Sequence, residues 1–298
     1  MKKYQIPIAF ILTIIIWTTT PLAIQWSSTS APMTSLMLRM LVGMLFCLVL
    51  MGLLGMKLPI DEHARRLYVI GGLSMFGSMT MVYFAAQSIP SGWISVIFCL
   101  SPLVTGIFAT FVEPDSKLNT ARVFGIVLGF VGLYLVFQAG LSFSSDTLPS
   151  IGLLVASVFI ASISSVYIRK LSTNNHLLPM QVTVGGLLVA IPFFVLMVYL
   201  VEPQIIVQFS KKEIASILYL GMIGTGVGFT IYYYLLKKIP ASKVALITLI
   251  TPVLSLLLGS VVNNEPILHE IWLGAACVFI GLLIYEFSPK ARWPRHQL

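Results

Sequence analysis

The chain has 298 residues, of which 58% are hydrophobic and only 9% are charged, and its formal net charge is +8. Soluble domains contain about 45–50% apolar and about 25% charged residues, so this composition excludes a soluble globular protein. The apolar runs are about twenty residues long, as bilayer-crossing helices require, whereas transmembrane barrels show alternating segments of roughly ten residues. We therefore expect an all-α polytopic membrane protein in a lipid bilayer, with no nucleic-acid partner for the positive charge.

Ten apolar segments follow one another along the chain, separated by charges, prolines and polar clusters. The first begins after Lys2 and Lys3 and resembles a signal peptide, but no small-residue cleavage site follows promptly, so we expect an uncleaved membrane span. The ten predicted transmembrane helices cover residues 5–25, 33–55, 66–87, 91–112, 119–139, 149–170, 177–201, 213–236, 241–262 and 266–287. The connections are short and leave little room for a soluble domain.

The distribution of lysine and arginine predicts the orientation of these helices, because cytoplasmic loops retain positive charge. If the N-terminus is cytoplasmic, every Lys and Arg except Lys211, Lys212 and Arg39 lies in a cytoplasmic segment or at the cytoplasmic end of a span. The opposite orientation would place this charge outside. We therefore predict that both termini are cytoplasmic and that residues 288–298 form a basic cytoplasmic tail.

An internal repeat relates the two halves of the chain at an offset of about 150 residues. The matches are Tyr83 with Tyr233, Ile89-Pro90-Ser91 with Ile239-Pro240-Ala241, Ser101-Pro102-Leu103 with Thr251-Pro252-Val253, Glu113-Pro114 with Glu265-Pro266, and Gly132-Leu133 with Gly281-Leu282. Each half has five spans, an odd number, so the second copy enters the membrane in the opposite orientation. The charges agree, because the loop at Pro90 lacks Lys and Arg while the loop at Pro240 is rich in Lys. We predict two inverted five-helix repeats, residues 5–139 and 148–287.

Inverted repeats are a recurrent design of secondary transporters, in which two related halves open a site alternately to each side. No Asp, Glu or His lies at the predicted mid-membrane level, so facilitated diffusion or exchange fits the sequence at least as well as proton coupling through Glu113 or Glu265. The sequence has no Walker motif, and its cysteines and histidines are scattered, so we expect no ATP-driven pumping, metal or cofactor. Two alternatives stay open: a membrane-embedded lipid-modifying enzyme, which would need clustered acidic or His residues, and a non-transporting membrane assembly component.

The motifs of both halves resemble those of the EamA-type members of the drug/metabolite transporter superfamily. The first half has Trp17 followed by small polar residues, Ala31-Pro32 ahead of Leu38-Arg39, and Ile-Pro-Ser and Ser-Pro-Leu in span four, and the second half repeats the pattern. The resemblance covers nearly the whole chain. It implies a central cavity lined mainly by spans one, three, four, six, eight and nine, and export or uptake of small organic metabolites, often amino acids, across a bacterial inner membrane. One departure is Gln25, which stands where the family often has Lys, so a preference for anionic substrates is not carried over.

Arg39 is the one charge that lies clearly inside a predicted span. A charge in hydrocarbon costs at least about 2 kcal/mol, so its guanidinium should face a cavity or a partner. It either anchors a substrate carboxylate or forms a gate, or it has a structural role and extends to the outer membrane surface or to helix-end carbonyls.

Pro102 and Pro252 lie at matching, mid-membrane positions of spans four and nine. Each removes a backbone hydrogen bond and kinks its helix, which frees carbonyl groups where a cavity can use them. Hydroxyl residues accompany the prolines at i and i+4, as the pairs Ser101 with Thr105 and Thr251 with Ser255. We predict a hinge or gate at the prolines. The hydroxyls either line the cavity or stabilise the kinks and help the helices to pack.

Spans one, three and eight supply further candidates for the cavity wall. In span eight, Gly221, Thr225, Gly228 and Tyr232 fall on one helical face, which is either a packing seam or a cavity wall. The predicted substrate-binding residues are Trp17, Thr20, Arg39, Tyr83, Ser101, Thr105, Thr225, Tyr232, Thr251 and Ser255, and the predicted hinge or gate residues are Pro21, Pro102 and Pro252.

The sequence thus predicts a secondary transporter, working as an exporter, facilitator or exchanger and not as an enzyme. Its expected substrates are small neutral or zwitterionic metabolites such as amino acids, which cross the bacterial inner membrane by alternating access. Gly125 and Gly129 form a GxxxG pattern in span five, which favours close packing between helices or protomers. We expect a monomer or a homodimer.

Overall fold

The computed structural model describes residues 5–112, 119–141, 147–172, 176–203, 208–249, 251–265 and 269–287, and every regular element in these ranges is a helix. The first half contains α1 (Gln5–Ser27), α2 (Pro32–Leu53), α3 (Glu62–Ala85), α4 (Ser91–Phe98), α5 (Ser101–Val112) and α6 (Thr120–Leu141). The second half contains α7 (Thr147–Ser172), α8 (Pro179–Val201), α9 (Lys211–Tyr219), the π-helix η2 (Leu220–Val227), α10 (Gly228–Lys238), α11 (Ala241–Ala245), the 3₁₀ helix η3 (Leu246–Leu249), α12 (Thr251–Asn263) and α13 (His269–Phe287). The predicted tail at 288–298, and Glu113 with its loop, lie outside the described residues.

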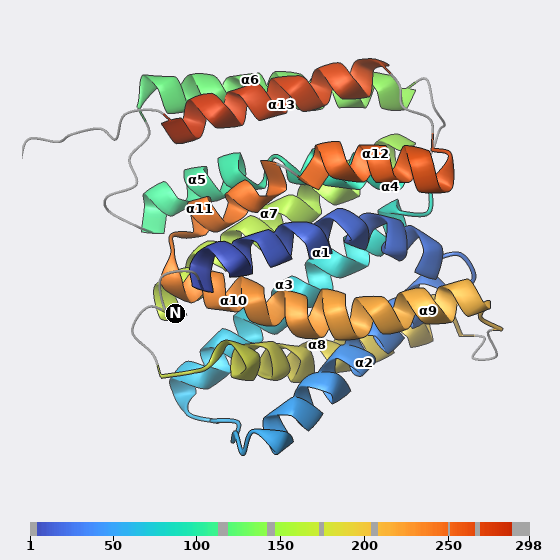
Figure 1. Ribbon diagram of the computed structural model, residues 1–298, viewed down its shortest axis with the longest axis vertical. Coiled ribbons are helices and arrows are strands. Elements are labelled where there is room, and N and C mark those ends of the chain that lie inside the picture. The colour runs from blue at the N-terminus through green and yellow to red at the C-terminus, as the bar shows by residue number, and fades with distance from the viewer. Residues whose placement is uncertain are drawn as a thin grey trace, which may run out of the picture.

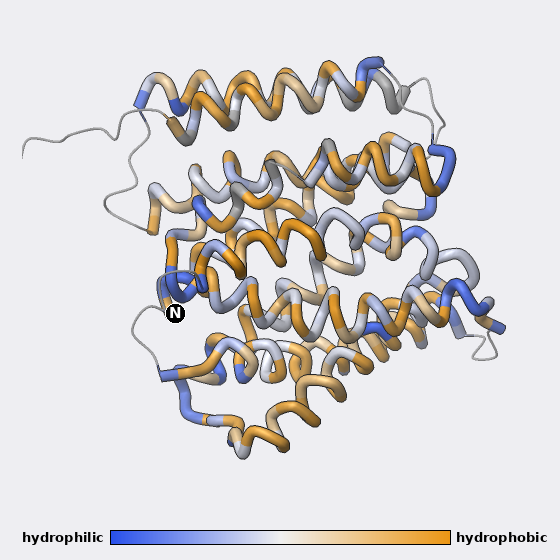
Figure 2. Tube along the Cα trace, in the orientation of Figure 1, coloured by the Kyte–Doolittle hydropathy of each residue, from blue (hydrophilic) through white to orange (hydrophobic). Residues whose placement is uncertain are grey.

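The helices have the length and the apolar character that a bilayer requires. Seven helices or continuous helical runs can cross a membrane: Gln5–Ser27, Pro32–Leu53, Glu62–Ala85, Ser91–Val112, Thr147–Ser172, Pro179–Val201 and Lys211–Lys238. Shorter apolar helices cover Thr120–Gly132, Leu254–Asn263 and His269–Tyr285. The helices run roughly side by side, and hydrophilic residues gather at the two ends of the bundle while its middle is apolar (Figures 1 and 2). The expectation of an all-α, multi-pass membrane protein is confirmed.

The start of α3 differs from the predicted boundary more than any other described helix end. The predicted span begins at residue 66, after a charged cluster, but the helix begins at Glu62. Asp61 is its N-cap, and its carboxylate accepts hydrogen bonds from the backbone N–H groups of His63 and Ala64, each at 3.1 Å. Because a capping carboxylate satisfies amides that the first helical turn leaves free, the charges extend the helix instead of ending it.

The helices pack around a common centre, except for one pair at the edge of the bundle. In the centre, α3 packs against α7 and α8, α2 against α8 and η2, and α1 against α9, α10 and α12. The two interrupted spans also meet, because α4 packs against α12 and α5 against α11. The edge pair is α6 and α13, which run in opposite directions at the top of Figure 1.

Glycines allow α6 and α13 to approach each other closely. A side chain on Gly281 would place its Cβ 2.5 Å from the backbone oxygen of Gly125, and one on Gly132 would place it 2.5 Å from the backbone oxygen of Gly274. The GxxxG pattern of span five therefore serves helix packing within the chain, since Gly125 faces α13 and Gly129 faces Leu103.

We expect Gly281→Ala to lower the stability of the folded protein by about 1–3 kcal/mol, because the new methyl group forces two backbones apart. The measurement is the midpoint of thermal unfolding in detergent. Gly152→Ala is the matched control, because a Cβ at Gly152 would meet no atom within 4 Å. Equal midpoints for the two variants would contradict the close approach.

The helices are interrupted at both prolines for which kinks are predicted. Span four is broken between Phe98 and Ser101, just before Pro102, and span nine passes from α11 through η3 to α12, just before Pro252. The two breaks touch, since the thiol of Cys99 donates to the backbone oxygen of Thr248 at 2.9 Å. By contrast, α1 continues through Pro21, as α8 continues through Pro192.

Candidate functional site

A cavity lies at the centre of the bundle. About 1220 Å³ of atom-free space lies within it, including the part open to the surroundings. Its walls come from α1, α3, α4, α5, α7, α10 and the region from α11 to α12, together with Gly224 of η2 and Arg39 of α2. These are the spans that the family resemblance implied, with the second span added.

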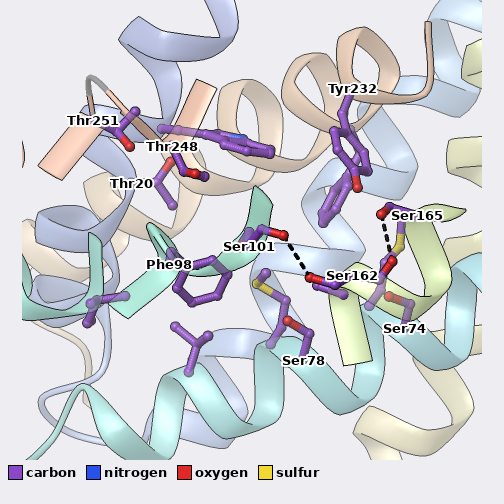
Figure 3. A pocket seen from close by; sticks show the side chains of 18 of the residues that line it. Thr20, Ser74, Ser78, Phe98, Ser101, Ser162, Ser165, Tyr232, Thr248 and Thr251 are labelled. Atoms are coloured by element: carbon purple, nitrogen blue, oxygen red, sulfur yellow. Dashed lines mark hydrogen bonds between the residues drawn. The ribbon is translucent and has the colours of Figure 1, made fainter. Parts of the chain in front are cut away.

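Hydroxyl groups from several helices line this cavity (Figure 3). They belong to Thr20, Ser74, Ser78, Ser95, Ser101, Thr105, Ser162, Ser165, Thr248 and Thr251. Several donate to nearby oxygens: Thr20 to the carbonyl of Ile16 at 2.7 Å, and Ser165 to the carbonyl of Ser162 at 2.8 Å. A hydroxyl that donates its hydrogen in this way keeps its oxygen lone pairs as acceptors. The wall can therefore receive N–H and O–H groups of a ligand.

Aromatic rings form another part of the wall. Trp17 of α1 and Tyr232 of α10 lie against each other with their ring centres 5.5 Å apart. Phe98 and Phe229 line the same cavity, and Phe98 and Tyr232 both project toward its space (Figure 3). Rings of this size present flat apolar surfaces, so the cavity suits a ligand with a hydrophobic part.

Among the described residues that line the cavity, only Arg39 has a charged side chain. The residue is only 2% exposed, so its guanidinium does not extend to the surface of the bundle. Its Nε donates to the hydroxyl of Thr225 at 3.0 Å, and its Cζ lies 5.9 Å from the ring centre of Tyr83. Its Nη1 is buried and has no hydrogen-bond partner. Of the two interpretations of Arg39, the geometry favours the one in which it faces the cavity.

Most of the predicted site residues line the cavity, and a few pack behind the residues that line it. The residues that line the cavity are Trp17, Thr20, Pro21, Arg39, Ser101, Thr105, Tyr232 and Thr251. Tyr83 is fully buried beside α1, where its hydroxyl lies 3.2 Å from that of Ser27. Thr225 holds Arg39, and Ser255 donates to the carbonyl of Thr18 at 2.9 Å. Pro102 and Pro252 are buried at the helix breaks.

Sequence reasoning missed several wall residues. Ser74 and Ser78 lie on one face of α3, and Ser162 and Ser165 lie on α7. A signal was available, because the i, i+4 serine pair in span three repeats the hydroxyl spacing that singled out span four. The stretch from 161 to 165 is likewise the most hydroxyl-rich part of span six.

A hydrogen-bond network ties α1, α4 and α12 together at one end of the bundle. Asn263 donates to the side-chain oxygens of Gln25, at 2.9 Å, and Glu265, at 3.0 Å, and accepts from the indole N–H of Trp26 at 3.0 Å. Glu265 also accepts from the hydroxyl of Ser91 at 3.0 Å, at the first turn of α4. We call these five residues the end network. They join helices from both halves of the chain, next to one end of the cavity.

Among the described residues, no group of three or more His, Cys, Asp or Glu side chains is placed to hold a metal ion.

Comparison with known proteins places this chain in a family. The sequence profile described as the EamA-like transporter family matches residues 6–138 and 148–286. The "Uncharacterized transporter YoaV" of Bacillus subtilis is 25% identical over 86% of this chain and 87% of its own length. The "Probable amino-acid metabolite efflux pump" of Salmonella typhimurium is 24% identical over 73% of this chain and 75% of its own, and the "Uncharacterized inner membrane transporter YedA" of Escherichia coli is 24% identical over 91% and 87%. A solved crystal structure superposes with a TM-score of 0.71 over 93% of this chain and 96% of that chain, and at 21% identity this likeness shows the fold alone.

Proposed function

The chain belongs to the EamA-like transporter family and is a membrane transporter, and from this premise we propose that it moves small neutral or zwitterionic metabolites, such as amino acids, by alternating access. The observation that carries the proposal is the central cavity, whose wall combines hydroxyl groups, aromatic rings and a buried guanidinium. A relative is named as an amino-acid metabolite efflux pump, which supports the substrate class. We propose that the protein lies in the bacterial inner membrane. We propose no enzymatic activity.

Ten spans in two inverted repeats, residues 5–139 and 148–287, are part of this proposal. In this correspondence α1 matches α7, α2 matches α8, α3 matches α9 to α10, α4 and α5 match α11 and α12, and α6 matches α13. Contacts between helices of the two halves have counterparts in which every helix is replaced by its match. The contact of α3 with α7 corresponds to that of α9 and α10 with α1. Likewise, α4 with α12 corresponds to α11 with α5, and α5 with α7 corresponds to α12 with α1. The α2–α8 and α6–α13 pairs map onto themselves. Paired contacts of this kind are what a two-fold related structure requires.

Single hydrogen bonds join the corresponding pairs of helices in both halves. Near the C-terminal end of α1, Gln25 donates to the carbonyl of Ile89, just beyond α3, at 3.4 Å. Near the C-terminal end of α7, Arg169 donates to the carbonyl of Leu236, in the last turns of α10, at 2.9 Å. These two bonds lie at opposite ends of the bundle. We propose that they mark the two gates, with the end network at the outer gate.

The orientation that we propose has both termini in the cytoplasm. The start of α1 and the end of α13 lie at the same end of the bundle, on the left of Figure 1. Lys237 and Lys238 end α10 at that side, whereas Glu213, Glu265 and the end network lie at the other. Positive charge therefore gathers at the proposed cytoplasmic face.

In the proposed site, Trp17, Thr20, Arg39, Ser101, Thr105, Tyr232 and Thr251 contact the substrate. Tyr83, Thr225 and Ser255 act from behind the wall, because each bonds a neighbouring helix or Arg39. Pro102 and Pro252 serve as hinges, and Pro21, which lines the cavity, serves as a further hinge or gate residue.

Reconstitution tests the proposal most directly. The purified protein in lipid vesicles is offered radiolabelled amino acids, nucleosides and vitamins, under proton, sodium and solute gradients in both directions. We expect saturable flux of one substrate class and faster uptake when the same solute is preloaded inside, as alternating access requires. Empty vesicles are the control for leak. If no solute moves under any gradient, the transport proposal is wrong, and non-saturable flux without exchange would contradict alternating access.

A further inference from the structure

The guanidinium of Arg39, a residue of the cavity wall, has unused hydrogen-bonding capacity. Its Nε is occupied by Thr225, but its Nη1 is buried without a partner. A buried, unpaired charge is costly, and a structural role would normally satisfy all its donors. Arg39 also lines the cavity, so a small movement of its side chain would bring this donor into contact with a substrate there.

No carboxylate of the residues that the structure describes forms an ion pair with Arg39. No Asp or Glu side chain is among the residues that line the described cavity. The neighbours of the guanidinium are the hydroxyl of Thr225 and the ring of Tyr83, both of which are neutral. An anionic group of the substrate would complete the pairing, and a planar carboxylate matches the two-pronged geometry of a guanidinium.

The remainder of the wall indicates what the carboxylate is attached to. Trp17, Phe98, Phe229 and Tyr232 provide apolar surface, whereas the hydroxyls provide scattered acceptors and no negative charge. An ammonium group can be accepted by these oxygens, but they cannot bind it as strongly as a carboxylate would.

We propose that Arg39 is a carboxylate anchor and that the substrates are organic acids, including amino acids, with a large apolar or aromatic body. This rests on the proposed transport function but changes its substrate class: zwitterionic amino acids stay in it, organic anions are added, and fully neutral solutes and amines are poor ligands. Thr225 is a positioning residue, because its hydroxyl fixes the Nε edge of the guanidinium and leaves the other edge for the substrate. The α-amino group of an amino acid contributes less than its carboxylate.

Two matched sets of probes test the anchor on the unaltered protein. Each set keeps the same apolar side chain and contains an amino acid, the acid that lacks its amino group and the amine that lacks its carboxylate. The first set is phenylalanine, 3-phenylpropionate and phenethylamine, and the second is leucine, 4-methylpentanoate and isopentylamine. Binding is measured at equilibrium on purified protein in detergent. In at least one set we expect the amino acid and the des-amino acid to bind, and the amine to bind more weakly by about 30-fold or more, as for the loss of a buried charge partner. Amine binding as tight as acid binding, or no acid binding in either set, would overturn the proposal.

Variants at Arg39 locate the anchor. Arg39→Gln is expected to lose about 30-fold or more in affinity for the acids, and Arg39→Lys to recover part of the loss because it keeps the charge without the planar fork. Thr225→Val keeps the charge and should weaken acid binding less than Arg39→Gln. Unchanged acid affinity in folded Arg39→Gln contradicts the anchor. If that variant does not fold, Arg39→Lys and Thr225→Val decide, because unchanged acid affinity in both would also contradict the anchor.

Flux measured in vesicles separates this inference from the proposed function. Acid binding that depends on Arg39 without any transport would overturn the function and leave the anchor. Transport of amines or nucleosides that Arg39→Gln leaves unchanged would overturn the anchor and leave the function.

Discussion

A reversible cross-link between positions 25 and 263 is expected to stop transport almost completely, and its reduction is expected to restore the rate. Gln25 belongs to α1 and Asn263 ends α12, and their side chains share a hydrogen bond of 2.9 Å at one end of the bundle. Both helices also contribute to the cavity wall. A hydrogen bond is worth only about 1 kcal/mol net, so it opens readily, whereas a covalent link holds the two helix ends together. If substrate passes between these ends, the link blocks its exit.

The experiment uses Gln25→Cys with Asn263→Cys and a short thiol-reactive reagent whose bridge is cleaved by a reductant. Cys47 and Cys99 are buried, so only Cys277, which is partly exposed, needs replacement by serine. The readout is flux in vesicles before and after reduction.

A matched control joins two positions of a single helix. Glu62 and Arg66 are exposed and form an ion pair one turn apart on α3, so Glu62→Cys with Arg66→Cys accepts the same bridge without joining two helices. This link should leave transport unchanged. Full cross-linking at positions 25 and 263 with undiminished flux would show that the end network is not a gate.

The all-α membrane class of the protein and the positions of its seven long apolar helices could be predicted because they depend on hydrophobic length, which a sequence displays directly. The irregular helix geometry at Pro102 and Pro252 could also be predicted from the sequence, since proline lacks the N–H that a continuous helix needs. The start of α3 was misplaced because charges near a helix end indicate either a loop or a cap. Only the contact of Asp61 with His63 and Ala64 distinguishes the two.

Span eight shows why a helical face could not be predicted in full. The expected face assumed the regular α-helical period, but residues Leu220–Val227 form a π-helix, which shifts the register. As a result Gly221 packs against Val42 of α2 and Thr225 bonds Arg39, while Gly224 and Tyr232 line the cavity. The one predicted face is divided between a packing seam and a wall, and no local sequence signal marks the change of register.

The environment of Arg39 likewise depends on residues far away in the sequence. Its position inside a span was evident, but the choice between a surface and a cavity position rests on Thr225 and Tyr83, which lie in other spans. Long-range contacts of this kind follow from how the helices pack, and this packing cannot be predicted from the periodicity of any one helix.

Replacing either mid-membrane proline by alanine is expected to slow transport about tenfold while leaving the amount of folded protein in the membrane nearly unchanged. Proline in a helix interior costs about 3 kcal/mol, so alanine favours a continuous helix, and even half of this energy corresponds to about a tenfold change in an equilibrium. Pro102 and Pro252 each follow a break that contacts the cavity, at Ser101 and Thr251 respectively. A helix that no longer bends there would hold the cavity in one of its two states.

Pro192→Ala is the matched control for both variants, because Pro192 lies inside the continuous helix α8, which contributes no residue to the described cavity wall. It removes the same ring and restores the same N–H group, but away from the proposed hinges. The readouts are flux in vesicles and, separately, the yield and thermal midpoint of the purified protein. Loss of yield in proportion to flux would mean that the prolines matter for folding and not for motion.

The contact between the two breaks gives Pro252 a sharper test. Proline at position 252 leaves the carbonyl of Thr248 without its usual helical donor, and the thiol of Cys99 donates to this oxygen from the other half of the chain at 2.9 Å. In Pro252→Ala the new N–H competes with the thiol for the same carbonyl. Cys99→Ala should therefore reproduce part of the slowing with both prolines intact, because it also uncouples the breaks. If Cys99→Ala transports at the normal rate while Pro252→Ala is slow, each break bends independently, and the coupling between the halves must pass through other contacts of α4, α5, α11 and α12.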